Sequence, residues 1–201
     1  MQGRIVEYLE RINDYMKTLT YNHTGTQFFE TRPNSSMLTL MDTAKTMIRE
    51  ALPIKCMEAV VLSIYLTNGV PCLGRFPINF KSELPARPGM PQKFFYHVVL
   101  GLAHGNRFGA LGLSRRSTLM TKNVDHTSLY DLVTNFDEAY KECGHKLVKV
   151  RIGNLISHDA YSIAPIPWRG ITIYPRVEEP QDVKSKVDRF SRELRSSLRN
   201  R

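Results

Sequence analysis

The 201-residue sequence predicts an α+β fold, in which helices come first and a mainly antiparallel sheet with flanking helices follows. Apolar residues recur at helical spacing through the first third of the chain, whereas aromatic and β-branched residues dominate a run over 94–102. A turn signal at 104–106 separates that run from a second apolar run. We therefore divide the chain into a helical lobe, residues 1–70, and a sheet-containing lobe, residues 71–201, which form one compact unit.

The first helix is predicted over residues 4–19, because its apolar residues alternate at spacings of four and three between charged flanks. The apolar seam consists of Ile5, Leu9, Ile12, Met16 and Leu19. This seam suits packing on the protein's own core, which we favour, and it also suits the binding of a partner helix.

A loop over 21–34 and two further helices complete the helical lobe. Ser35 or Ser36 provides a cap for the second helix. Pro53 ends that helix and opens the third, which is predicted over about 54–66.

The sheet-containing lobe begins with an irregular connection, which is predicted from its many prolines. These are Pro71, Pro77, Pro85, Pro88 and Pro91. Residues 94–113 then form a β-hairpin, 129–140 a helix, and 147–152 and 171–174 further strands.

The last segment, residues 182–201, predicts a basic amphipathic helix with seven basic and three acidic residues. A docked surface helix with a solvated charged face is the favoured interpretation. Contact with a microtubule or with another acidic protein tail is the functional alternative.

Composition limits the classes of function. The 28 basic and 19 acidic residues give a net charge of +9, which favours encounter with polyanions. Three cysteines form neither a paired disulfide framework nor a metal set, so we expect an intracellular protein. No apolar run approaches the roughly 20 residues of a spanning helix, and no signal peptide is visible.

Cys56 is the candidate nucleophile, because it lies where the proline-initiated third helix should begin. The helix dipole and neighbouring Lys55 would both favour its thiolate. Cys72 and Cys143 open no clear helix, and each is a weaker candidate.

His97 is the candidate general base, because it interrupts an otherwise apolar strand, where an unpartnered imidazole would be costly. Ser114 is the candidate third member. A four-residue hairpin loop would place Ser114 directly opposite His97, and a two-residue loop at His104 and Gly105 would place it diagonally. A satisfied core histidine and a buried structural cysteine are the simpler explanations of each residue alone.

Charged residues flank this candidate triad. Lys55 lies beside Cys56, and Arg115 and Arg116 follow Ser114, which favours an anionic substrate such as a C-terminal carboxylate. Ordinary surface basicity is the alternative. No phosphate-binding glycine loop, zinc-ligand spacing or paired-carboxylate signature is present, so we expect no cofactor and no metal.

Several ordered blocks of the sequence resemble the vasohibin family. The blocks are 20–30 (TYNHTGTQFFE), 50–56 (EALPIKC), 65–68 (YLTN), 75–78 (RFPI), 97–101 (HVVLG), 109–112 (GALG) and 114–116 (SRR). The resemblance implies a transglutaminase-like cysteine protease architecture. It also implies a tubulin tyrosine carboxypeptidase in which Cys56, His97 and Ser114 act together.

The resemblance further implies that Tyr21, Lys55 and Arg115 bind the substrate, the C-terminal tail of α-tubulin. It implies a cytoplasmic, cytoskeleton-associated enzyme with no nucleic acid partner. Family members in animals work with a small helical binding protein, for which the seam on the first helix is the expected site. Two other functions stay open, namely transglutaminase-type acyl transfer and a non-catalytic module that binds microtubules or acidic tails.

Overall fold

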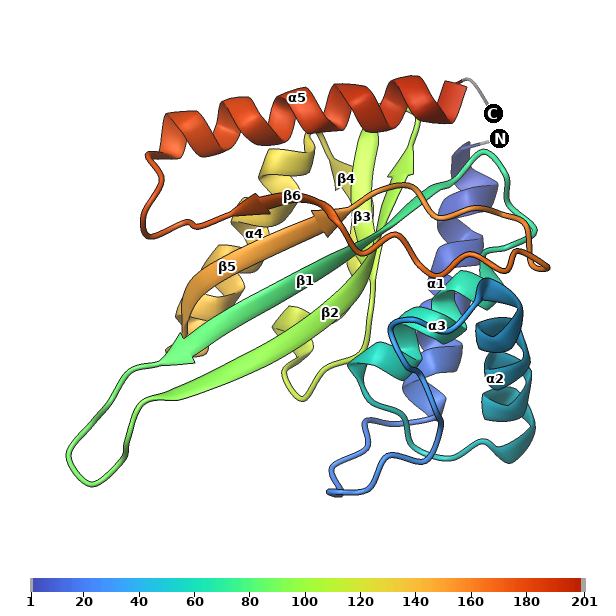
Figure 1. Ribbon diagram of the computed structural model, residues 1–201, viewed down its shortest axis with the longest axis horizontal. Helices are drawn as coiled ribbons and strands as arrows, with labels where there is room; N and C mark the ends of the chain where they lie inside the picture. The colour runs from blue at the N-terminus through green and yellow to red at the C-terminus, as the bar shows by residue number, and fades with distance from the viewer. Residues whose placement is uncertain (1, 200–201) are drawn as a thin grey trace.

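The structure is a computed structural model that describes residues 2–199, and it has the predicted α+β architecture (Figure 1). Five α-helices surround one sheet. They are α1 (Gln2–Thr18), α2 (Met37–Glu50), α3 (Cys56–Leu66), α4 (Leu129–Glu142) and α5 (Pro180–Arg199). A short 3₁₀ helix, η1 (Ser117–Leu119), precedes the fourth strand.

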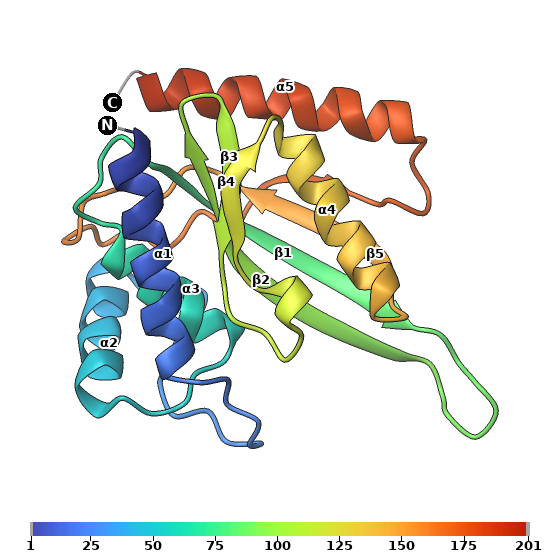
Figure 2. The ribbon, with the colours of Figure 1, turned by 180° about the vertical axis from the view of Figure 1, so that it is seen from behind.

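All pairings in the six-stranded sheet are antiparallel, and the strand order is β4-β3-β2-β1-β5-β6. The strands are β1 (Gly74–Leu84), β2 (Lys93–His104), β3 (Arg107–Leu111), β4 (Lys122–His126), β5 (Lys146–Gly153) and β6 (Gly170–Ile173). The two central strands, β1 and β2, pair along their whole length, and the loop between them extends away from the helices in both views (Figures 1 and 2).

Alternate residues of the central strands enter two separate hydrophobic cores. Val98, Leu100 and Leu102 of β2 join the core that contains α1, α2 and α3. Val99 and Ala103 join the core that contains α4 and α5. This alternation is the period-two pattern of a strand that is covered on both faces.

The apolar seam of α1 packs on the protein's own core, which confirms the favoured interpretation. Leu9, Ile12, Met16 and Leu19 are all buried in the core shared with α2 and α3. Ile5 packs at the margin of this core. The seam residues therefore contribute to the stability of this chain itself.

The prediction of an irregular connection before the hairpin was wrong, because β1 occupies most of it. Pro77 is tolerated because it lies at the end of the β1–β5 ladder, whose last registered pair is Ile78 with Ile152. The remaining proline-rich segment, 85–92, is the loop between β1 and β2, and there Arg87 and Met90 exchange two backbone hydrogen bonds.

The hairpin of β2 and β3 has a two-residue turn, Gly105 and Asn106, because His104 pairs with Arg107. Gly105 has a φ of 56°, a left-handed conformation that favours glycine. The last registered pair is Leu100 with Leu111, so the ladder stops before the level of His97. Beyond this point the β3 side of β2 is free to contact other parts of the chain.

The basic helix α5 docks on the second core through Val183, Val187, Phe190 and Leu194, as the favoured interpretation predicted. In Figure 1 it lies along the top of the sheet. The last two residues of the predicted helix lie outside the described residues. Within residues 2–199, no helix combines the length and the apolar character needed to cross a membrane.

Candidate active site

The segment before Cys56 is held in an extended conformation rather than in a helix. Pro53 was predicted to open α3, but the helix begins three residues later, at Cys56, with Lys55 as its N-cap. Ile54 instead forms a parallel bridge with Tyr21, in which Asn22 N–H donates to Ile54 O at 2.8 Å. This bridge places the Tyr21 loop beside the first turn of α3.

Glu58 fixes this junction from inside the protein. Its side chain is fully buried and accepts hydrogen bonds from the backbone N–H groups of Lys55 and Phe29. The first is a capping interaction at the start of α3, and the second ties the end of the 21–34 loop to the same helix. The carboxylate thereby holds the 21–34 loop against the start of α3, where Cys56 lies.

The Cys56 sulfur lies at the open edge of β2. Its hydrogen-bond donors are backbone groups of Val98, Met57 and Cys56 itself. Val98 follows His97 and lies beyond the last β2–β3 pair, where the strand edge has no neighbouring β3 residue. The early end of β3 thus lets the start of α3 approach the strand segment that carries the imidazole.

The expected thiolate preference of Cys56 was wrong in direction. Burial raises the pKa of the Cys56 thiol, and the nearby backbone hydrogen bonds oppose this only in part. The negative charge of Glu58 raises this pKa further. The resting group is therefore a neutral thiol that needs a base.

His97 is held by a backbone carbonyl. Its Nε2 lies 2.8 Å from Leu119 O, and its ring stacks against Phe80 at a centroid distance of 6.3 Å. Burial lowers the pKa of His97 to about 4, although the Leu119 carbonyl favours the charged form. The imidazole is therefore neutral near pH 7.

The carbonyl also determines which nitrogen of His97 carries the proton. A carbonyl oxygen can only accept a hydrogen bond, so Nε2–H must be the donor to Leu119 O. In the neutral ring, Nδ1 then keeps its lone pair and can accept a proton. This tautomer has the free basic nitrogen that a neutral thiol requires.

The Ser114 hydroxyl and the His97 imidazole have different hydrogen-bond partners. If the β2–β3 register continued, Ser114 would lie opposite His97, as the four-residue alternative predicted. The ladder ends at the pair of Leu100 and Leu111, so Ser114 and His97 are not a registered pair. The buried Ser114 Oγ accepts from Arg116 N–H at 3.3 Å, whereas the imidazole bonds to Leu119 O.

Tyr21 and Arg115 contact each other, and Tyr21 bridges the backbone of Ile54, two residues before Cys56. The Arg115 guanidinium lies 5.7 Å from the centroid of the Tyr21 ring. Burial raises the pKa of Tyr21, the Cys56 charge raises it further, and Arg115 lowers it. The structure thus pairs Arg115 with the Tyr21 ring.

The other two predicted basic residues point in different directions. Lys55 Nζ donates to Gly25 O at 3.4 Å, so its charge lies over the 21–34 loop. Arg116 is exposed, and its charge contributes to the lowered pKa of His145, for which burial is the larger cause. Arg116 therefore faces the α4 side of the molecule, whereas Arg115 faces Tyr21.

Sequence reasoning missed Leu119 and Glu58. The contribution of Leu119 is a main-chain oxygen, which no side-chain pattern can reveal. Glu58 had a detectable signal, because a Glu three residues after an N-cap position is the second half of a capping box.

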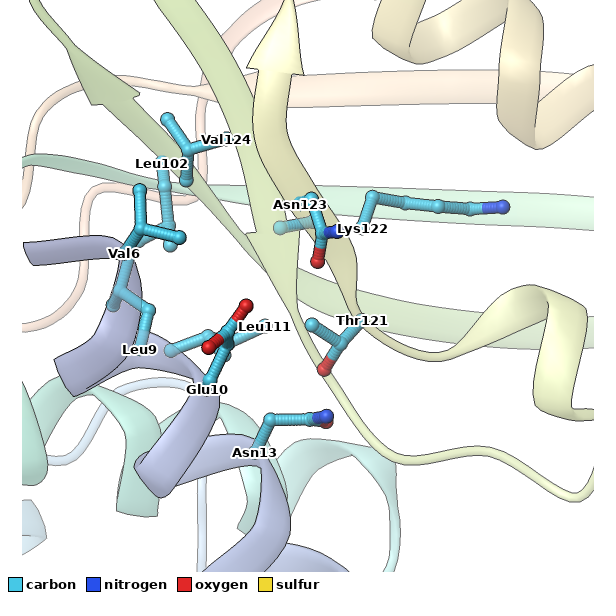
Figure 3. Close-up of a pocket in the computed structure, with 11 residues that line it drawn as sticks. Val6, Leu9, Glu10, Asn13, Leu102, Leu111, Thr121, Lys122, Asn123 and Val124 are labelled. Carbon is cyan, nitrogen blue, oxygen red and sulfur yellow. The ribbon is translucent and has the colours of Figure 1, made fainter. Parts of the chain in front are cut away.

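A separate groove lies between α1 and the strands β3 and β4 (Figure 3). Its cavity volume is about 30 Å³, so the groove is shallow. Val6 and Leu9 of α1 face Leu102 and Val124 across it, and Glu10 and Asn13 lie toward its other end. None of the predicted catalytic residues lines this groove.

Comparison with known proteins identifies the family of the chain. The vasohibin family profile matches residues 1–195. Tubulinyl-Tyr carboxypeptidase 1 of Mus musculus is 44% identical over 194 residues, which are 96% of this chain and 50% of that protein. The chain thus spans about half the length of the curated relative it matches. Because the profile covers nearly the whole chain, the protein belongs to the vasohibin family.

Proposed function

We propose that the protein is a cysteine carboxypeptidase that removes the C-terminal tyrosine of α-tubulin. The observation that carries this proposal is the approach of the Cys56 sulfur to the backbone of Val98, next to the neutral His97, with Arg115 and Tyr21 beside it. The name of the mouse relative, tubulinyl-Tyr carboxypeptidase, supports the choice of substrate.

In this mechanism, Nδ1 of His97 takes the proton from the Cys56 thiol as the sulfur attacks the last peptide carbonyl. The carbon–nitrogen bond then breaks, the imidazolium gives its proton to the leaving amine, and tyrosine departs. A thioester joins Cys56 to the shortened tail. Water, deprotonated by His97, hydrolyses the thioester and restores the thiol.

The low pKa of His97 favours the second proton transfer, in which the imidazolium gives its proton to the leaving amine. With a neutral thiol and a neutral imidazole, the resting site holds no buried ion pair. A buried imidazolium gives up its proton readily, because burial disfavours the charged form. The Leu119 carbonyl keeps the ring in the reactive tautomer. The predicted orienting role of Ser114 stays a proposal, and its hydrogen bond to Arg116 N–H supports a role in shaping the connection to η1.

Positive charge beside Cys56 supports recognition of a chain end. Arg115 lies against Tyr21 and Lys55 immediately precedes Cys56 in the chain, and a terminal carboxylate is the anion that a carboxypeptidase must hold. Tyr21 offers an aromatic surface for the terminal side chain. The net charge of +9 favours encounter with an acidic tail and with the microtubule surface.

Two further properties belong to the same proposal. We place the enzyme in the cytoplasm, associated with the cytoskeleton. A small helical partner is also proposed, and the groove between α1 and β4 supports it, because that groove leaves apolar side chains of α1 at its wall (Figure 3). The buried seam of α1 is not available for such a partner.

The test is incubation of tyrosinated tubulin with the protein, followed by measurement of free tyrosine. Cys56→Ala should abolish release, and Cys72→Ala, which alters an exposed cysteine, should leave it unchanged. Mass spectrometry of the tail separates hydrolysis from ligation to an amine. Binding without any Cys56-dependent product would instead identify a non-catalytic module.

A further inference from the structure

The first half of β2 has an unpaired edge on the side away from β1. Pairing of β2 with β1 continues to Lys93, whereas its pairing with β3 ends at Leu100. Among residues 2–199, no backbone hydrogen bond joins residues 93–97 to a segment other than β1. An unpaired strand edge presents a row of N–H and C=O groups with which another extended chain can pair.

The contact with Cys56 determines which residues face this open edge. The backbone N–H of Val98 donates toward the Cys56 sulfur, so Val98 directs its main-chain groups to the open side. The main-chain groups of successive residues point alternately to the two sides of a strand. Phe94 and Tyr96 therefore direct their N–H and C=O groups to the same side as Val98, whereas Phe95 directs its groups to β1.

The open edge is accessible from solvent. The exposed fractions of Phe94, Phe95 and Tyr96 are 46%, 38% and 73%, although all three side chains are large and aromatic. In Figure 2 this half of β2 runs past the end of β3 toward the loop between β1 and β2. Both the main-chain groups and an apolar surface are thus available to a partner beside the catalytic cysteine.

Positive charge lies on one face of this edge. Lys81 of β1 is the register partner of Tyr96, and its ammonium lies 4.2 Å from the centre of the Phe94 ring. Glu83, two residues further along β1, is paired with Arg176 at 2.8 Å, so its charge is already balanced. A carboxylate that lies along the edge can therefore reach a cation on this face.

The other face also carries positive charge. The Phe95 ring lies 4.9 Å from the ring of His145, and the charge of Arg116 acts on that same imidazole. Lys93 adds a further cation at the first residue of the edge. An extended acidic peptide is the partner that complements both the charges and the main-chain groups.

We propose that the open edge of β2, from Lys93 to Val98, binds the acidic segment that precedes the scissile bond of the substrate, as an added β-strand. This inference rests on the proposed function for the identity of the peptide. The added strand runs parallel to β2, because its C-terminal end has to reach Cys56 beside Val98 and β3 occupies the edge from Leu100 onward. At about 3.3 Å per residue, the edge accommodates about five residues of the substrate.

Backbone N-methylation of a substrate peptide tests strand addition without changing any side chain. The probe is a synthetic peptide that ends in tyrosine preceded by glutamates, and one N-methyl group is moved along it one position at a time. Affinity is measured by fluorescence anisotropy with the Cys56→Ala protein, and kcat/KM for tyrosine release is measured with the unaltered protein. We expect losses of about fivefold or more at alternate positions and little loss between them, because every second N–H of an added strand faces β2.

The same peptide with glutamine in place of glutamate tests the charge of the occupant. It should bind about fivefold or more weakly at low ionic strength, since it keeps the backbone and loses the carboxylates. Equal affinity of the two peptides would contradict an acidic occupant.

A pair of protein variants tests the edge from the other side. Tyr96→Pro removes an N–H that faces the open edge, a place where a strand tolerates proline. Tyr96→Ala is the matched control, since it also removes the aromatic side chain but keeps the N–H. Tyr96→Pro should bind the peptide about fivefold or more weakly than Tyr96→Ala, with kcat and melting temperature unchanged between them. In the Cys56→Ala protein, peptide binding should also slow amide hydrogen exchange at Phe94 and Tyr96.

Three results would overturn the inference: N-methylation losses without a two-residue period, equal peptide affinity of the two Tyr96 variants, and unchanged amide exchange at Phe94 and Tyr96 in the bound state. Failure of the proposed function looks different. In that case the unaltered protein releases no tyrosine, while anisotropy and amide exchange still report whether the peptide adds to β2. Normal tyrosine release with no periodic effect would leave the proposed function in place and remove the added strand alone.

Discussion

Acidification should weaken the protein through His97 by an amount that follows from its burial. The ordinary imidazole pKa is 6.5, and burial lowers that of His97 to about 4 in the folded protein. Between these values the unfolded chain binds more protons, so stability that is present above pH 6.5 is lost as the pH falls through 4. The difference of about 2.5 pH units is worth about 3 kcal/mol, at about 1.4 kcal/mol per unit.

The assay is urea unfolding at several values between pH 7 and pH 4, for the unaltered protein and for His97→Gln. Glutamine has no titrating group, and its amide can still donate to Leu119 O. Because all other titrating groups are shared, the difference in unfolding free energy between the two proteins isolates His97. That difference should shift by about 3 kcal/mol in favour of the variant as the pH falls from 7 to 4.

A difference that stays constant across this pH range would refute the reasoning, since it would mean that His97 titrates at its ordinary pKa in the folded protein. The same result would remove the argument that the Cys56 thiol and the His97 imidazole are both neutral in the resting protein. A shift centred near pH 6.5 with the opposite sign would show a stabilised imidazolium, and with it an ion pair with Cys56.

Two substitutions test the scaffold of the site. Glu58→Ala leaves one buried and one half-buried backbone N–H group unpaired, and it should lower the unfolding free energy by about 2–4 kcal/mol, together with kcat/KM. Glu58→Gln keeps one acceptor oxygen, so its loss of stability should be smaller than that of the alanine variant. A loss below about 0.5 kcal/mol for Glu58→Ala would contradict the assigned role. Gly101→Ala would place a Cβ 2.3 Å from the buried Phe76 ring and should cost about 1–3 kcal/mol in urea unfolding. Gly69→Ala, where nothing lies within 4 Å, is the control, and equal stability of these two variants would argue against the close packing.

Local signals in the sequence were sufficient for the helices. The seam of α1 and the Ser36 cap of α2 lie within one or two turns of the residues they organise, so spacing and capping chemistry predict them directly. Cys56 was found in the same way, since its place at the start of a helix depends on its immediate neighbours. Here the prediction and the structure agree on position.

The strand β1 shows where such reasoning stops. Its one proline, Pro77, argues against a strand, and the sequence does not show that this residue lies where pairing with β5 ends. That exception depends on the position of β5, about seventy residues later in the chain. Only the assembled sheet reveals that the residue is compatible with a central strand.

The sequence by itself determined which residues can do the chemistry: a cysteine at a helix start, a histidine in an apolar strand and basic residues on either side. Tertiary structure decided the pKa values and the contacts of these residues. Burial reversed the expected direction of the Cys56 pKa, and the early end of β3 opened the strand edge at Val98. The fold also supplied Leu119 O as the partner of His97, because solvation and main-chain contacts depend on segments that meet only in the folded protein.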